Sequence, residues 1–157
     1  MSESCCSTSH RPPDTRCCPV SEFRSKPVEW STVAALAARC VPPRQYFWLC
    51  EDSDCDVVYF GEDGTLLGTR DVRVIPSFKG SPSQNDLVCY CFLYSRQDIE
   101  DELKASGETT IFERISAEVK AENCACEVRN PSGKCCLGGV KRAIQETREK
   151  SQMTQET

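Results

Sequence analysis

The sequence predicts an α+β fold in which a small β-rich unit precedes a small helical unit. Two runs of aromatic and β-branched residues, YFWLC and DVVYF, lie before residue 75 and are typical of strands. Apolar residues spaced four apart follow after residue 95 and are typical of amphipathic helices. We therefore expect a β-rich unit over residues 16–75, a Pro-, Ser- and Gly-rich linker over 76–86, a helical unit over 87–147, and disordered tails over 1–15 and 148–157.

The β-rich unit is expected to contain a hairpin with a cysteine at each side of its turn. YFWLC and DVVYF flank the turn EDSD, which separates Cys50 from Cys55. The stretch GEDG then turns the chain toward TLLGT and DVRVI. Before the hairpin, STVAALAA predicts a short helix that Cys40 and the following VPP bring to a close. We expect Cys40 to be a buried small apolar residue.

The helical unit is expected to contain three helices. The first, SRQDIEDELKASG, begins with Ser95 as N-cap and ends at Gly107. The second, TTIFERISAEVKAEN, has an apolar face with residues four apart over 111–119. The third begins near Cys136 and fades into the polar stretch REKSQMTQET.

Cysteine is strongly enriched, with 13 in 157 residues, a density typical of small secreted domains held together by disulfides. Three features oppose that interpretation: the count is odd, most of the cysteines form adjacent or alternate pairs, and the first residues contain no apolar signal segment. Adjacent cysteines bridge each other poorly but can offer their thiolates to one ion. Because no apolar run approaches the roughly 20 residues needed to span a membrane, we expect a soluble, cytoplasmic protein whose thiols bind metal.

The charge and the remaining reactive residues argue against two other classes of protein. The net charge is −5 and the pI is about 5.0, whereas nucleic-acid-binding proteins present a basic surface. The single histidine, His10, lies in the N-terminal tail, where we expect it to be solvated, and no nucleophile–base set is visible. Cys5 and Cys6 lie in the same tail and cannot complete a tetrahedral site as an isolated pair. We therefore expect neither an enzyme nor a nucleic-acid-binding protein.

The cysteines of the β-rich unit have the arrangement of a zinc site. A knuckle of two cysteines across a tight turn, here CEDSDC, that faces a second cysteine pair is how small ribbons bind tetrahedral zinc. The predicted zinc ligands are Cys17, Cys18, Cys50 and Cys55.

The cysteines of the helical unit form two groups that are expected to meet. Cys89 and Cys91 come just before the first helix, and the stretch NCACEVRNPSGKCC lies between the second and third helices. Two helices joined by a short loop return the chain toward its start. Four thiolates that converge at helix ends suit a 2Fe–2S cluster, because free backbone N–H groups there can donate to sulfur. The same arrangement would accept zinc, and the spacing alone does not separate the two metals.

These motifs resemble two related families. VCYCF, a helix pair and CACEVRNPSGKCCLGGV resemble the bacterioferritin-associated-ferredoxin-like (BFD-like) 2Fe–2S domain. CDVVYF and NPSGKCCLG are more closely similar to the N-terminal domain of the CopZ family of copper chaperones, in which a zinc site and a 2Fe–2S site occur together. The resemblance covers about residues 17–145 and implies that Cys89 and Cys91 are cluster ligands.

The other two cluster ligands are expected among four cysteines, Cys124, Cys126, Cys135 and Cys136. The two corresponding cysteines of the smaller ferredoxin lie two residues apart, whereas the insert EVRNPSG separates the candidates here. We favour Cys126 and Cys136, because Cys136 lies at the N-terminus of the last helix, where the helix dipole favours a thiolate. Cys124 and Cys135 are the alternates.

The zinc site departs from the pattern of the relatives at one position. They commonly have C-P-x-C-G at the first knuckle, whereas this chain has CCPVSE, with Ser21 where the second cysteine is expected. Either Cys17 supplies the missing thiolate or a three-thiolate site remains.

The resemblance implies a role in metal homeostasis. In the family, this domain is joined to a C-terminal domain with an M-x-C-x-x-C copper site, and the present sequence contains no C-x-x-C. We expect a one-electron carrier that reduces and binds Cu(II)/Cu(I) or another thiophilic ion and exchanges electrons with an unidentified redox partner. The alternatives are a plain ferredoxin-like electron donor to a partner enzyme and a structural zinc module that docks a partner.

Overall fold

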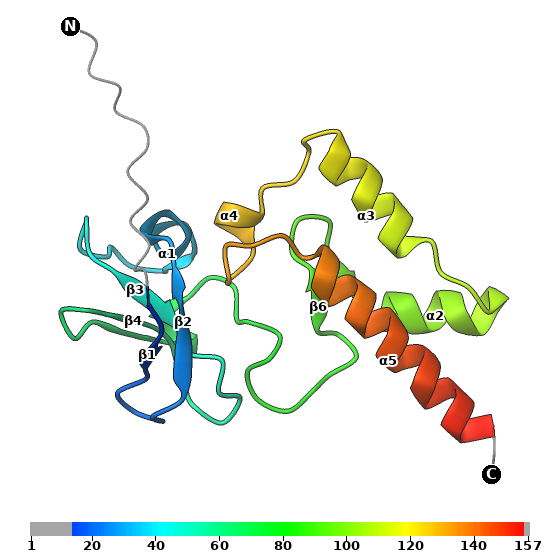
Figure 1. The fold of residues 1–157 in the computed structure, drawn as a ribbon, viewed down its shortest axis with the longest axis horizontal. Helices are drawn as coiled ribbons and strands as arrows, with labels where there is room; N and C mark the ends of the chain where they lie inside the picture. Colours follow the sequence, from blue (N-terminus) through cyan, green and yellow to red (C-terminus); the bar gives the residue numbers. More distant parts are fainter. Residues whose placement is uncertain (1–13, 156–157) are drawn as a thin grey trace, which may run out of the picture.

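The computed structural model describes residues 14–155 (Figure 1). Its first part is a five-stranded antiparallel sheet in the order β1-β2-β3-β4-β5. One α-helix lies between β2 and β3, and a 3₁₀ turn follows β5. The elements are β1 (Arg16–Cys17), β2 (Arg24–Val28), α1 (Trp30–Leu36), β3 (Phe47–Leu49), β4 (Val57–Gly61), β5 (Leu66–Gly68) and η1 (Thr69–Asp71).

The two faces of the sheet bury different side chains, because successive residues of a strand point to opposite sides. On β3, Phe47 and Leu49 belong to an apolar core that includes Val33 of α1. Trp48, between them, faces the other side and stacks on Phe60 of the neighbouring strand, with ring centroids 5.7 Å apart. This second face also carries the buried cysteines of the unit.

The helix α1 ends earlier than expected, and this changes the environment of Cys40. Ala37 is extended and forms a β-bridge with Val72, and the N–H of Ala38 donates to the carbonyl of Asp71. The chain therefore leaves the helix four residues before Cys40. Cys40 is exposed, so the expectation that it is a buried apolar residue was wrong.

The second part begins with a short hairpin and continues with helices. The hairpin was not expected, because its strands are only three and two residues long. One short helix, within the cysteine-rich stretch, was also not expected. The elements are β6 (Leu87–Cys89), β7 (Tyr94–Ser95), α2 (Arg96–Ser106), α3 (Ile111–Lys120), α4 (Cys126–Arg129) and α5 (Leu137–Gln155).

The predicted N-cap and the terminal glycine of α2 are confirmed, whereas the predicted end of α5 is wrong. The Ser95 hydroxyl accepts from the backbone N–H of Asp98, and Gly107 ends α2 with a φ of 78°. Helix α5 continues to Gln155, so the expectation of a disordered tail from residue 148 is wrong for residues 148–155. Repeated polar residues do not stop a helix when they lack Gly or Pro. No helix within residues 14–155 has the length and apolar character needed to cross a membrane.

The helices of the second part enclose an apolar core that also contains four cysteines. The buried aliphatic side chains come from α2, α3 and α5, and α2 and α3 each pack against α5. They are Ile99, Ile111, Ile115, Val140, Ala143 and Ile144. The predicted α+β fold is thus confirmed.

The stretch between Cys126 and Cys136 lies against the β-rich unit, and α4 lies beside α1 (Figure 1). The Thr32 hydroxyl of α1 donates to the carbonyl of Glu127 at 2.6 Å. The buried Tyr59 hydroxyl donates to the carbonyl of Pro131, also at 2.6 Å. Gly133 has a φ of +69°, and a Cβ there would lie 2.6 Å from the Thr32 Oγ1. The insert EVRNPSG is therefore the surface through which the two parts meet.

The stretch that we expected to be a linker, residues 76–86, also has specific contacts with both parts. Pro76 is fully buried, and the Tyr90 hydroxyl accepts from the backbone N–H of Ser77 at 2.9 Å. Lys79 donates through Nζ to the carbonyls of Asp52 and Cys55, at 2.7 and 3.0 Å. The division into two independent units stays a prediction.

Candidate metal centres

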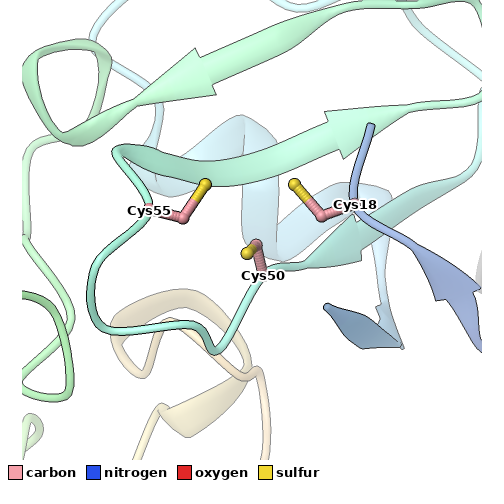
Figure 2. Close-up of side chains that lie close together, drawn as sticks. All are labelled: Cys18, Cys50 and Cys55. Atoms are coloured by element: carbon pink, nitrogen blue, oxygen red, sulfur yellow. The ribbon is translucent and has the colours of Figure 1, made fainter. Parts of the chain in front are cut away.

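Three buried cysteines of the β-rich unit converge on one point (Figure 2). The sulfurs of Cys18, Cys50 and Cys55 all lie within 4.8 Å of one another. Zinc bonds to thiolate sulfur at about 2.3 Å, which places the sulfurs of a tetrahedral site about 3.8 Å apart. Small adjustments of the side chains would therefore bring all three sulfurs into contact with one ion.

Two tight turns position these thiols. In the first, the N–H of Cys18 donates to the carbonyl of Phe23, and the N–H of Glu22 returns a bond to the carbonyl of Cys18, both at 2.9 Å. Glu22 has a φ of 59°, the left-handed conformation that closes this turn. In the second, the N–H of Cys50 donates to the carbonyl of Val58 at 2.9 Å, and Lys79 binds the carbonyl of Cys55.

Hydrogen bonds and burial act differently on the thiols of this site. Burial opposes the thiolate of Cys18, but backbone N–H groups of Ser21 and Val20 donate to its sulfur and lower its pKa below the ordinary value. At Cys55, burial outweighs the N–H of Val57 and raises the pKa. The neighbouring thiolates raise it further, so a bound cation would favour the fully deprotonated set.

The structure brings together three of the four predicted zinc ligands and not the fourth. Cys17 lies on β1 opposite Arg24 and is exposed. The position near the three sulfurs is taken instead by Ser21, whose Oγ lies 3.5 Å from the sulfur of Cys50.

Four buried cysteines of the second part belong to its apolar core, and they form two close pairs. The sulfurs of Cys91 and Cys126 lie 3.5 Å apart. The thiols of Cys89 and Cys136 form a second hydrogen-bonded pair. The backbone N–H of Ala125, at the start of α4, donates to the sulfur of Cys91 at 3.3 Å. The structure thus brings the favoured set together, and their role as ligands stays a prediction.

The two alternates lie at the edge of this cluster. Cys124 is half-buried and packs against the core, and Cys135 is exposed. The sequence did not indicate α4, a single turn whose first residue is Cys126. Helices this short lack the repeated apolar spacing that reveals longer ones.

Hydrogen bonds and burial shift the pKa values of three of these thiols in different directions. The hydrogen bond with Cys136 lowers the pKa of Cys89 to about 6, despite its burial. The same hydrogen bond, together with burial, raises the pKa of Cys136. Burial raises the pKa of Cys126 to about 12. Metal ions that bind here would release protons from Cys126 and Cys136.

A cleft of about 410 Å³ lies between the two parts and reaches this cluster. Cys135 and Cys136 line one wall of it, and Leu49 and Phe78 are among the residues from the other part of the chain. Four cationic side chains line the cleft, in a protein with a net negative charge. They are Lys26, Arg96, Lys134 and Arg142, and the first two form ion pairs with Glu51 and Glu146, which also line the cleft.

Comparisons with known proteins agree with this architecture. Residues 15–73, which include the three converging cysteines, match the family model of the CopZ-type zinc binding domain. The fold is similar to the X-ray structure of the Archaeoglobus fulgidus CopZ N-terminal domain, with a TM-score of 0.65 and 25% sequence identity. That match covers 81% of this chain and 96% of the other. No curated protein matches the sequence.

The family match and the three converging cysteines support a metal-binding, zinc-binding class of domain in the first part of the chain. The family match and the structural match together support a CopZ N-terminal-like domain over most of the chain. The resemblance to the CopZ N-terminal domain is therefore confirmed, whereas the BFD-like assignment stays a prediction.

Proposed function

We propose that the protein binds zinc through Cys18, Cys50 and Cys55 and holds a 2Fe–2S cluster at its second set of cysteines in a BFD-like domain. The ligands of the cluster are Cys89, Cys91, Cys126 and Cys136. In the cell the protein carries single electrons in metal homeostasis. It reduces Cu(II), or another thiophilic ion, and retains the reduced form on thiols.

The observation that carries this proposal is the arrangement of the second set of thiols in two pairs. Within the described residues, the only group of three or more Cys, His, Asp or Glu ligand atoms within 4.8 Å of one another is that of Cys18, Cys50 and Cys55. The second set therefore does not converge on one point, as a single zinc ion requires. A 2Fe–2S cluster has two irons, and each iron takes two protein thiolates. One close pair of cysteines for each iron fits that requirement.

The buried surroundings of the second set favour a cluster that transfers electrons over a metal ion bound at the protein surface. All four sulfurs lie in an apolar core, and the N–H of Ala125 aims at one of them. Hydrogen bonds to sulfur and exclusion of water are the protein's means of adjusting a cluster's potential. A 2Fe–2S cluster supplies one electron, which is what the reduction of Cu(II) to Cu(I) requires.

The cleft between the two parts is an opening that reaches the second set of thiols. Cys136 contributes to its wall, and the exposed thiol of Cys135 lies beside it. Soft Cu(I) prefers thiolate ligands, so Cys135 and the half-buried Cys124 are the described thiols beside the second set that would retain it. Cys5 and Cys6 are further candidates and lie outside the described residues.

Metal analysis and an absorption spectrum of the anaerobically purified full chain test the proposal. We expect a red-brown protein with about two irons and two sulfides per chain, and with about one zinc. A colourless protein with zinc at both sets of cysteines, from iron-replete cells, would contradict the cluster.

The alternative is a plain ferredoxin-like electron donor, which the burial of all four thiols of the second set in an apolar core also suits. Anaerobically reduced protein mixed with Cu(II) separates the two functions. Our proposal expects about one cluster reoxidised per copper and Cu(I) that remains with the protein after gel filtration. Reoxidation with all copper released would favour the electron donor.

A further inference from the structure

Within residues 14–155, the proposed zinc site of the first part has three thiols, and a hydroxyl lies where a fourth ligand would be. Ser21 Oγ is 3.5 Å from the sulfur of Cys50, and it is also in hydrogen-bonding reach of the thiols of Cys18 and Cys55. A side chain that faces three converging sulfurs occupies the fourth corner of their tetrahedron.

Among the described residues, no other protein ligand is available at this corner. Within residues 14–155, no fourth Cys, His, Asp or Glu ligand atom lies within 4.8 Å of all three sulfurs. Cys17 is the nearest cysteine in sequence, but it is exposed on β1, and the bond from the N–H of Cys18 to the carbonyl of Phe23 fixes the turn that follows it. Cys17 could reach the site only if this turn opened.

The fourth corner is also the most accessible part of the site. The three cysteines are 0–7% exposed, whereas Ser21 is only half-buried. Its neighbours Val20 and Phe23 are exposed, at 61% and 42% of their surface. A small molecule would therefore approach the metal from the side of Ser21.

A neutral hydroxyl is a much weaker zinc ligand than a thiolate. Zinc sites that are purely structural have four protein ligands, whereas sites with three keep the fourth position for water or an exogenous ligand. We propose that this zinc site is of the open type, with three thiolates and an exchangeable fourth position beside Ser21 that accepts a small thiol. The inference rests on the proposed zinc binding and adds the identity of its fourth ligand.

Zinc K-edge X-ray absorption of the full chain reads this directly, because it is specific for zinc and unaffected by iron. In buffer with a phosphine reductant and no thiol, we expect three sulfurs and one oxygen at zinc. Added 2-mercaptoethanol should convert this to four sulfurs in the wild type and in Ser21→Ala. Ser21→Cys should have four sulfurs without added thiol, and Cys17→Ala should match the wild type as the control.

The rate of zinc transfer to a chromophoric chelator gives a second readout. We expect Ser21→Cys to release zinc at least about tenfold more slowly than the wild type, because a fourth thiolate replaces a weak ligand. Ser21→Ala should release it at least as fast as the wild type.

Two results would overturn the inference while leaving zinc binding intact. Four sulfurs in the thiol-free wild type, reduced to three by Cys17→Ala, would make Cys17 the fourth ligand. If zinc keeps one oxygen ligand in both the wild type and Ser21→Ala after thiol is added, the fourth coordination position is closed to small thiols. A protein that binds no zinc at all would instead refute the proposed function of the site.

Discussion

The two sets of cysteines present the same type of ligand in two different geometries. The first set holds three thiols within 4.8 Å of one another, in turns at the end of a sheet. The second set holds four thiols as two pairs within the core of a helical bundle. Thiols that converge suit one ion, and thiols in separate pairs suit two irons. If the proposed metals are bound, the geometry of the thiols, more than their number, would select between zinc and a 2Fe–2S cluster.

The variant expected to have the largest effect changes one of the paired cysteines of the second set. Replacement of Cys126 by serine removes one member of the pair with Cys91, and a hard oxygen replaces a soft thiolate. We expect iron to fall from about two per chain to a small fraction of that value, with zinc retained. Cys135→Ser is the matched control, since Cys135 is exposed, and should leave iron content and spectrum unchanged. Equal loss of iron in both variants would contradict the assignment.

The reciprocal change tests the first set. Cys50 is fully buried and shares the site with Cys18 and Cys55, so Cys50→Ala should abolish tight zinc binding while the iron content stays near its wild-type value. Cys40→Ala, at an exposed cysteine of the same part, is the control. Loss of iron along with zinc in Cys50→Ala would mean that the two sets depend on each other.

The contact between the two parts can be disturbed without touching a cysteine. A methyl group at Gly133 would lie 2.6 Å from Thr32 Oγ1, and the φ of +69° disfavours any side chain there. We expect Gly133→Ala to lower the free energy of unfolding by about 1–3 kcal/mol. Gly80→Ala, where φ is +76° and an added Cβ meets nothing within 4 Å, has the same φ cost without the close contact and serves as the control in the same denaturant titration. An unchanged midpoint for Gly133→Ala would refute the close approach.

A smaller effect is expected from the hydrogen bond across the same contact. Tyr59→Phe leaves the buried carbonyl of Pro131 without its donor, which should cost about 1–2 kcal/mol. Tyr46→Phe, at an exposed tyrosine of the same part, should change stability little. Chemical denaturation measures both, and equal midpoints would show that the Tyr59 bond contributes nothing.

The smallest effect concerns the N-cap of α2. Ser95→Ala removes the acceptor for the N–H of Asp98 and should cost about 1 kcal/mol. Ser95→Asp should recover most of that loss, because Asp also caps helices. A loss that Ser95→Asp does not recover would indicate a role other than capping.

The features that depend on neighbouring residues could be predicted from the amino-acid sequence alone. Aromatic and β-branched runs predicted the hairpin of β3 and β4, and Ser95 and Gly107 marked the ends of α2. The motifs around Cys55 and Cys136 were enough to indicate the CopZ N-terminal-like architecture. Such signals are local, because helix caps, turns and strand alternation involve residues a few positions apart.

The sequence could not predict which cysteine of each adjacent pair faces inward, because that depends on the packing of distant segments. Cys18 is buried and Cys17 exposed, and Cys136 is buried and Cys135 exposed. The same holds for Cys40, which lies outside the core, and for the insert EVRNPSG, which lies against Thr32 and Tyr59. Neighbouring residues have nearly the same local surroundings in sequence. The side that becomes buried depends on segments that pack from far along the chain, and spacing does not encode that direction.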